Sequence, residues 1–477
     1  MKRWKPGPLA WVVVLTMGVL AASPAWAEPG GRLSPIAAPG GTLLERGQSL
    51  LGLLMLVVGT WALGYLRNGR RAVPWRVVGW GLGLMAAFTL VVFYLPTLLT
   101  TVNDVINALL GFTKAGARVV FGDLSSFTLP VEGTDAEGRP LTGVAQHGAY
   151  FAFFVLPTII FFSALTAVAY HSGVMQYVVQ AIAWVMSKSM KTSGAETLSA
   201  AANIFVGQTE APLMVKPFMR AATNSELMAI MVAGFANIAS GVLGLYTEWL
   251  QPFVRDAGGH LAAACFISAP ASLMVAKLLV PEDGTPVTAG GVKFHVERID
   301  ANLVDAAARG TSEGLTLALN VAAMLIAFTA LIALVNATLG WAGGLLGLPP
   351  GGQPLTLEMI LGVLFAPLAW LTGVPWSECR TVGALLGVKT VLNELIAYGQ
   401  MRDLLTANPQ ALSPRSSLLA TYALCGFANF ASVGIQVGGI ASIVPERRTD
   451  LARLGLLAMV GGGIATLMAA AMVGIVM

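Results

Sequence analysis

Three consecutive polar side chains, Gln208, Thr209 and Glu210, interrupt an apolar stretch of this sequence. Gly207 and Pro212 flank them, and both residue types break helices. A charged residue at the centre of a spanning helix costs about 2.5–3.5 kcal/mol on insertion scales, so in a membrane Glu210 would need a partner or a ligand. Unwound backbone at that depth is tolerated only where protein or a water-filled cavity satisfies it. The segment therefore indicates a polar binding site at a helix break.

A second acid beside a helix breaker is Glu378, in the string Pro-Trp-Ser-Glu that begins at Pro375. Two interpretations are open for Glu210 and Glu378: internal salt bridges with nearby basic residues, or a shared polar cavity. The basic residues in question are Lys216, Arg380 and Lys389. Two further polar residues follow Lys389, namely Asn393 and Glu394.

A short string is repeated in the second half of the chain. Gly-Phe-Ala-Asn-Ile-Ala-Ser at 234–240 recurs as Gly-Phe-Ala-Asn-Phe-Ala-Ser at 426–432, with six of seven residues identical 192 positions apart. Amide side chains donate and accept hydrogen bonds, whereas carboxylates only accept them. Together these groups suit a neutral, hydroxyl-rich solute with a hydrogen-bonding ring. Phe427 could pack on a ring face, although an isolated aromatic residue more often belongs to a core.

The composition limits the class of protein. Hydrophobic residues make up 56% of the 477 residues, and charged residues only 11%. An ordinary soluble domain carries about 25% charged residues. A soluble enzyme, a nucleic-acid-binding protein and a disordered chain are therefore excluded, and the sequence lacks a His/Glu metal motif or a Ser-His pair in a fitting context. We predict an all-α polytopic membrane protein.

Charge-free runs and the positions of Lys and Arg predict the topology. A spanning helix needs about 20 apolar residues. Eight spans are predicted near 48–66, 77–96, 148–171, 226–247, 260–280, 314–340, 416–444 and 454–476. Segments near 193–222 and 356–396 enter and leave on one side, so they are predicted re-entrant hairpins. The two repeat copies then run in opposite directions, an inverted repeat of the kind that brings broken helices together in secondary transporters.

Three segments lie outside these spans. Residues 1–27 have a basic start, a short apolar core and a small-x-small site ending at Ala27, which predicts a cleaved signal peptide; an uncleaved first helix is the alternative. Residues 101–121 predict an amphipathic helix, with Val105 on its apolar side and Asn103 on its polar side. Such a helix would lie on the membrane surface or pack against a partner, and an ordinary connector helix is the alternative. Residues 130–146 are predicted to be a loop.

Three strings resemble the concentrative nucleoside transporters, and they occur in the right order. They are Gly-Gln-Thr-Glu-Ala-Pro-Leu at 207–213, Pro-Trp-Ser-Glu at 375–378 and Phe-Ala-Asn-Phe-Ala-Ser at 427–432. The first is highly specific, and the resemblance covers roughly residues 45–477. It implies a homotrimer whose protomers each hold eight spans and two re-entrant hairpins, divided between a scaffold and a mobile transport domain.

The resemblance, with the leader, divides the chain into five parts. They are the signal peptide (1–27), scaffold helices with the interfacial helix (28–192), the first transport repeat (193–280), a cytoplasmic loop with the trimerisation helix (281–345) and the second transport repeat (346–477).

The resemblance also implies roles for single residues. Gln208, Thr209 and Glu210 would address a nucleobase, partly through water, and Val242 and Phe427 would line its apolar faces. The ribose hydroxyls would be bound by Glu378, Asn429 and Ser432. A carboxylate suits vicinal hydroxyls because charge-assisted hydrogen bonds are stronger than neutral ones.

A sodium site is implied between the first hairpin and the helix that follows it. The matching oxygen donors are the side chains of Asn203 and Asn237 and the carbonyls of Val206 and Gly241. Members that couple to sodium often carry Ser or Thr where this chain has Asn237, and an amide oxygen also coordinates a hard cation. Some bacterial members use protons instead, so sodium is favoured and a proton is the alternative.

The expected function is ion-coupled symport of nucleosides such as uridine across the bacterial inner membrane by alternating access. The ion would bind first and stabilise the hairpin conformation that accepts nucleoside. No covalent chemistry and no nucleic-acid partner are expected. Transport of another neutral polar solute is the alternative.

Overall fold

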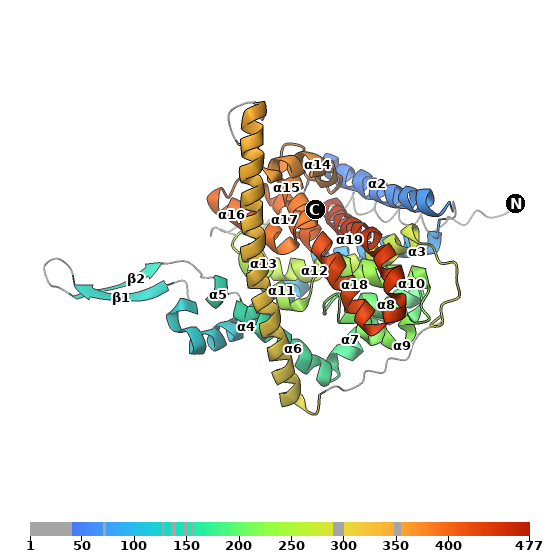
Figure 1. Ribbon diagram of the computed structural model, residues 1–477, viewed down its shortest axis with the longest axis horizontal. Helices are drawn as coiled ribbons and strands as arrows, with labels where there is room; N and C mark the ends of the chain where they lie inside the picture. Colours follow the sequence, from blue (N-terminus) through green and yellow to red (C-terminus); the bar gives the residue numbers. More distant parts are fainter. Residues whose placement is uncertain are drawn as a thin grey trace.

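The computed structural model describes residues 41–69, 73–125, 128–134, 140–146, 151–154, 156–289, 300–347 and 354–477. The predicted signal peptide lies outside the described residues. The described part is helical apart from one β-hairpin that projects from the side (Figure 1). Within the described ranges, seven helices are long and apolar enough to cross a membrane, or eight if one bent pair counts as a span. The predicted all-α polytopic membrane protein is therefore confirmed.

The first two helices of the described chain pack onto the middle of the bundle. α2 (Leu43–Asn68) starts with a capping box between Thr42 and Glu45, and α3 (Trp75–Tyr94) follows it. Both pack against α12 (Ala257–Leu279) and α19 (Arg448–Val476). α2 comes so close to α12 that a β carbon at Gly64 would collide with the carbonyl oxygen of Leu278. Small residues allow this approach, which is the common solution for helix contacts in membranes.

The predicted amphipathic helix at 101–121 lies within α4 (Pro96–Phe121), which continues as η1 (Gly122–Ser125). Its predicted sides are partly wrong, because Asn103 is buried and Val105 is 54% exposed. The buried face packs on α12 and α6 (Leu156–His171), so contacts with the protein rather than the polar pattern set the orientation. α4 is also long and apolar enough to span, so its place at the membrane surface stays a prediction.

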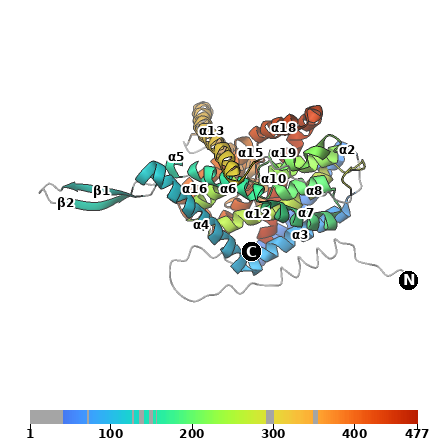
Figure 2. The same cartoon turned by 90° about the horizontal axis from the view of Figure 1, so that it is seen from below.

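The segment predicted to be a loop contains two strands instead. β1 (Thr128–Thr134) pairs with β2 (Pro140–Gln146) in antiparallel register, with Thr128 opposite Gln146 and Thr134 opposite Pro140. In both views this hairpin extends away from the helices (Figures 1 and 2). α5 (Phe151–Phe154) leads back to the bundle.

A long helix stands at the edge of the molecule. α13 (Leu303–Leu346) has 44 residues and packs along α6. Only 11% of its apolar window is buried, against 89% for α12, so α13 is peripheral, in front of the bundle in Figure 1 and at its upper edge in Figure 2, and α12 is central. α6 is followed at an angle of 79° by α7 (Val174–Met190), and Gly173 with φ 84° makes the bend.

The first repeat contains a hairpin, a broken helix and a continuous helix. The hairpin consists of α8 (Gly194–Ala202), η2 (Ala211–Val215) and α9 (Lys216–Met219). The broken helix consists of α10 (Asn224–Ala236) and α11 (Ser240–Leu250), and α12 follows. The hairpin falls in the predicted segment 193–222, and the broken helix covers the predicted span 226–247.

The second repeat has the same plan with one more helix. Its elements are α14 (Leu357–Leu371), α15 (Cys379–Val391), α16 (Glu394–Ala407), α17 (Pro414–Leu424), α18 (Phe430–Ile443), η3 (Pro445–Arg447) and α19. α14 and α15 pack against each other, and a second turn at 392–393 separates α15 from α16. The predicted span 416–444 is broken between α17 and α18.

Candidate functional site

The two copies of the repeated string meet where the broken helices touch. The break in the first copy covers 237–239, and the break in the second covers 425–429. A β carbon at Gly426 would stand 2.8 Å from the carbonyl oxygen of Phe235, so glycine allows the second copy to touch the first. The breaks free backbone and side-chain polar groups in the interior, as the inverted repeat predicts.

The tip of the first hairpin, residues 203–210, lies against both broken helices. Thr209 packs on α18, because a β carbon at Gly439 would stand 2.6 Å from its Cγ2 atom. Gln208 packs on α10, because a β carbon at Gly234 would stand 3.0 Å from its Cβ atom. These two predicted nucleobase residues therefore meet both broken helices.

The third nucleobase candidate, Glu210, is exposed, and its carboxylate lies over Gly207. Among the described residues Glu210 forms no ion pair, so the alternative of a salt bridge with Lys216 is not found there. Its carboxylate is thus available at the hairpin tip.

Asn203 and Asn237 each present a buried oxygen without a hydrogen-bond partner in the described chain. The Nδ2 atom of Asn203 donates to the carbonyl oxygen of Ser199 at 3.1 Å, and that of Asn237 donates to Ala233 at 3.4 Å. Within the part of the chain that the structure describes, their Oδ1 atoms and the hydroxyl of Ser199 have no hydrogen-bond partner. An unpaired buried polar atom costs about 1–3 kcal/mol, so these oxygens fit a cation.

Backbone contacts hold the expected sodium-site residues near each other. The nitrogen of Ser240, at the start of α11, donates to the carbonyl oxygen of Phe205 at 3.4 Å. This bond joins the hairpin tip to the helix that carries Gly241, and Val206 follows Phe205 directly. The oxygen-only chemistry of this group is what a hard cation such as sodium requires.

The buried acid beside Asn429 is Glu394, at the start of α16. The Nδ2 atom of Asn429 donates to Glu394 Oε2 at 3.2 Å, and the hydroxyl of Tyr246 donates to Oε1 at 3.0 Å. Tyr246 is held in turn by the ring of Tyr398, with ring centroids 4.5 Å apart. A buried carboxylate thus stands at the second break with its two donors.

Glu378, predicted to lie with Asn429, is somewhere else. Its Oε2 atom accepts from the backbone nitrogen and the hydroxyl of Ser413, both at 3.0 Å, at the first turn of α17. It forms no ion pair in the described chain, and Lys389 binds the carbonyl of Ala423 and the hydroxyl of Thr466 instead. The expected placement of Glu378 beside Asn429 is therefore corrected to Glu394.

A signal for Glu394 was present in the spacing. Asn203 precedes Asn237 by 34 residues, and Asn393 precedes Asn429 by 36. Within the repeat, the turn at 392–393 therefore corresponds to the tip of the first hairpin. The Pro-Trp-Ser-Glu string lies at the earlier turn, between α14 and α15.

One face of α18 runs from Glu394 to the tip of the first hairpin. Asn429 caps the helix by accepting from the backbone nitrogen of Ser432 at 2.8 Å, and Gln436 lies one turn further on. From Asn429 to Gly439 the helix rises about 15 Å. Glu394 therefore meets one end of this face, and the tip of the first hairpin meets the other.

The two apolar candidates stand at the two breaks. Val242 is buried in the first turn of α11, and Phe427 is half-buried in the break before α18. Val242 therefore lies close to the break that carries Asn237, and Phe427 lies in the same break as Asn429.

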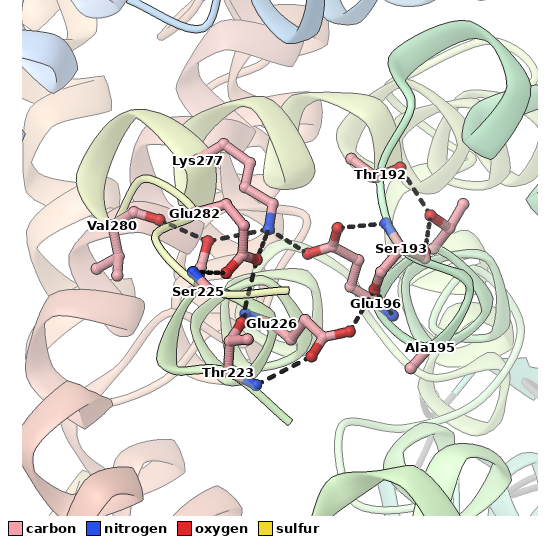
Figure 3. A network of polar contacts seen from close by, with 12 residues as sticks. Thr192, Ser193, Ala195, Glu196, Thr223, Ser225, Glu226, Lys277, Val280 and Glu282 are labelled. Atoms are coloured by element: carbon pink, nitrogen blue, oxygen red, sulfur yellow. Dashed lines mark hydrogen bonds and ion pairs between the residues drawn. The ribbon is translucent and has the colours of Figure 1, made fainter. Parts of the chain in front are cut away.

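A buried ionic network fastens the base of the first hairpin (Figure 3). Lys277 Nζ lies 2.7 Å from Glu196 Oε2 and 3.1 Å from Glu282 Oε2, and it donates to the hydroxyl of Ser225 at 2.9 Å. Glu196 belongs to the capping box of α8, and Lys277 lies at the end of α12. One lysine therefore ties α8, α10 and α12 into a unit.

The second repeat has a corresponding network around Arg415. Its Nη2 atom donates to the carbonyl of Gly474 at 2.7 Å and to the hydroxyl of Ser49 at 3.0 Å, and its Nε atom donates to the carbonyl of Gly373 at 3.4 Å. These contacts join α17, α19 and the turn before α15 to α2. α2 is thereby bonded to the second repeat.

Comparisons with known proteins cover nearly all of the chain. Family models described as the Na+ dependent nucleoside transporter N-terminus and C-terminus match residues 51–124 and 260–474, and one described as nucleoside recognition matches 152–253. The structure of CNTnw in an inward-facing substrate-bound state is 39% identical with a TM-score of 0.79, covering 91% of this chain and 98% of that one. The chain belongs to the concentrative nucleoside transporter family. A CNTnw double variant in an outward-facing state is also similar, with a TM-score of 0.78 at 39% identity over 90% of this chain and 97% of that one.

Curated relatives of this concentrative nucleoside transporter come from bacteria and animals. An uncharacterized transporter of Haemophilus influenzae is 38% identical, covering 90% of this chain and 97% of that protein. Sodium/nucleoside cotransporter 1 of Mus musculus is also 38% identical, covering 85% of this chain, which spans 60% of the mouse protein's length. Family membership makes the chain a multi-pass membrane transporter rather than an enzyme, with sodium as the coupling ion.

Proposed function

We propose that this transporter carries nucleosides such as uridine into the cell together with sodium, by alternating access. The observation that carries the proposal is the polar face of α18. Asn429 and Glu394 form one end of it, and the tip of the first hairpin touches the other end. A solute with hydroxyls on one side and a hydrogen-bonding ring on the other matches this order of groups.

The ribose end is assigned to Glu394, Asn429 and Ser432. Glu394 is an acceptor already surrounded by two donors, Tyr246 and Asn429. Vicinal hydroxyls would donate to this carboxylate, and hydrogen bonds to a charged group contribute about 1.5–3 kcal/mol each. Asn429 and Ser432 would supply an amide and a hydroxyl that both donate and accept. Glu394 takes the role first expected of Glu378.

The nucleobase end is assigned to Gln208, Thr209 and Glu210, with Val242 and Phe427 against the ring faces. The contacts of Gln208 with α10 and of Thr209 with α18 support this assignment, because they bring the hairpin tip to the face that carries Asn429. An aromatic and an aliphatic residue at the two breaks fit the two faces of a planar base.

The sodium ion is assigned to the side chains of Asn203 and Asn237 and the carbonyls of Val206 and Gly241. The unpaired Oδ1 atoms of the two asparagines support it. A cation there would order the hairpin tip that carries Gln208, so sodium binding would precede and strengthen nucleoside binding. A proton could not replace a cation bound by four neutral oxygens in the same way.

The transport domain that moves during the cycle is assigned more helices than those of the two repeats. α2 and α3 pack on α12 and α19, and Arg415 bonds to α2. We therefore assign α2 and α3 to the moving transport domain, narrowing the scaffold first expected over 28–192. α6 and α13 would form the scaffold, and the exposed side of α13 would hold a homotrimer in the bacterial inner membrane.

Nucleoside binding to the purified protein tests this function. Calorimetry of uridine in sodium chloride and in choline chloride should give a dissociation constant about tenfold or more lower with sodium. Equal affinity in the two salts would contradict sodium coupling. If a sugar or an amino acid from a competition panel displaced labelled uridine as well as unlabelled uridine does, another polar solute would be the favoured substrate.

A further inference from the structure

We propose that Gln436 is a further specificity-determining residue, and that with Gln208 it forms a pair of acceptors for an amino group of the nucleobase. The inference rests on the proposed nucleoside site and adds a residue to it. Gln436 lies on α18 at the helical spacing that puts it on the same face as Asn429 and Ser432. Its side chain is fully buried.

The orientation of the Gln436 amide is set by one hydrogen bond. Its Nε2 atom donates to the carbonyl oxygen of Met231 in α10 at 3.1 Å. Its Oε1 atom has no hydrogen-bond partner among the described residues. Rotating the amide would bring Gln436 Oε1 against the carbonyl oxygen of Met231. Oε1 therefore stays where it is, as an acceptor available to a donor of a ligand.

The second acceptor belongs to Gln208 at the hairpin tip. Gln208 is 7% exposed, and its Oε1 atom is also unpaired within the described part of the chain. The two glutamines meet at Gly234, where the Gln436 Nε2 and Gln208 Cβ atoms both lie within 3.0 Å of the point that a β carbon would occupy. Gly234 thus provides the space in which the glutamines come together.

Two amide oxygens that accept no hydrogen bond from the described residues call for a ligand group that donates two. An amino group on an aromatic ring carries two N–H bonds and donates in two directions, so it can satisfy both oxygens. Cytosine and adenine carry such a group. Cytidine and adenosine should therefore bind more tightly than the analogues that lack only this group, zebularine and purine riboside.

Calorimetry with these two pairs of nucleosides tests the proposal on the full-length protein. Wild type should bind each amino-bearing member about tenfold more tightly than its analogue, as expected for lost hydrogen bonds. Gln436→Met should lower this preference to about twofold or less, mainly by weakening the amino-bearing member. A merely structural role would weaken both members alike and leave the preference unchanged.

A second variant at the contact of the two glutamines and a control variant elsewhere complete the test. Gly234→Ala places a methyl group where the glutamines meet and should also reduce the preference. Gln176→Met is the matched control, because Gln176 likewise donates from Nε2 to a backbone carbonyl, of Tyr170 at 2.6 Å, and leaves Oε1 unpaired. The control should keep the wild-type preference.

The outcomes separate this inference from the proposed function. An unchanged preference in Gln436→Met, or no preference in wild type, would overturn the acceptor pair even where uridine binding depends on sodium. A weaker sodium affinity in Gln436→Met with an unchanged preference would make these oxygens cation ligands and would also overturn the proposal. Sodium-independent binding with a lost preference would overturn only the coupling.

Discussion

Asn429 donates a hydrogen bond to Glu394 at 3.2 Å across a separation of 35 residues, joining the second broken helix to the start of α16. Both side chains are buried, and Tyr246 supplies the second donor to the carboxylate. This contact supports our assignment of Glu394, rather than Glu378, to the proposed ribose site. The difference between Glu394 and Glu378 is therefore the first point to test.

Replacing Glu394 by Gln should raise the dissociation constant of uridine by about 100-fold, because two hydrogen bonds to a charged acceptor become neutral ones. Glu378→Gln is the matched control, since Glu378 only caps α17 through Ser413. We expect less than about a threefold change there. Calorimetry in sodium chloride measures both, and a larger effect at Glu378 would return the ribose role to that residue.

Replacing Asn237 by Ala should raise the sodium concentration for half-maximal uridine binding by about tenfold, because one oxygen ligand is removed. At saturating sodium the uridine affinity should stay close to wild type. Asn408→Ala, an exposed asparagine at the end of α16, serves as the control. If Asn237→Ala left the sodium dependence unchanged, the assigned ligands would be wrong.

Removing the positive charge of Lys277 from the buried network should lower the stability of the folded protein. Lys277→Met leaves Glu196 and Glu282 without their common partner, and breaking a buried pair costs about 3–5 kcal/mol. Thermal stability of the detergent-solubilised protein measures the loss. The exposed Lys188→Met should have little effect, and adding Glu196→Gln to Lys277→Met should recover part of the stability. No loss in Lys277→Met would refute the role of the network.

Packing of α2 on α12 can be tested with two glycines of the same helix. Gly64→Ala should lower the thermal stability, since its β carbon would meet the carbonyl of Leu278. Gly59 has open space around the corresponding position, so Gly59→Ala should be neutral or slightly stabilising through helix propensity. Equal effects of the two substitutions would argue against the close contact.

The sequence predicted most features that depend on local pattern. The helix breakers around Gln208 located the first hairpin, and the repeated string lies at the breaks that the structure shows within the predicted spans 226–247 and 416–444. The signal at the first hairpin is strong because a charged residue and unwound backbone are costly within a membrane unless a partner, a ligand or water satisfies them.

Features that depend on tertiary contacts were missed or misplaced. Glu394 was passed over for Glu378 because both acids follow helix breaks, and only the contact with Asn429 distinguishes them. Gln436 was missed because a single glutamine in an apolar run carries no local signal. The burial of Asn103 and the exposure of Val105 in α4 likewise follow from its packing on α6 and α12.

The most direct test of the account is uridine accumulation in proteoliposomes. Vesicles that contain the purified transporter would receive labelled uridine under an inward sodium gradient, an inward proton gradient or no gradient. The account predicts accumulation above the outside concentration only with the sodium gradient, and its loss in Glu394→Gln. Accumulation driven by the proton gradient alone, or wild-type uptake by Glu394→Gln, would contradict it.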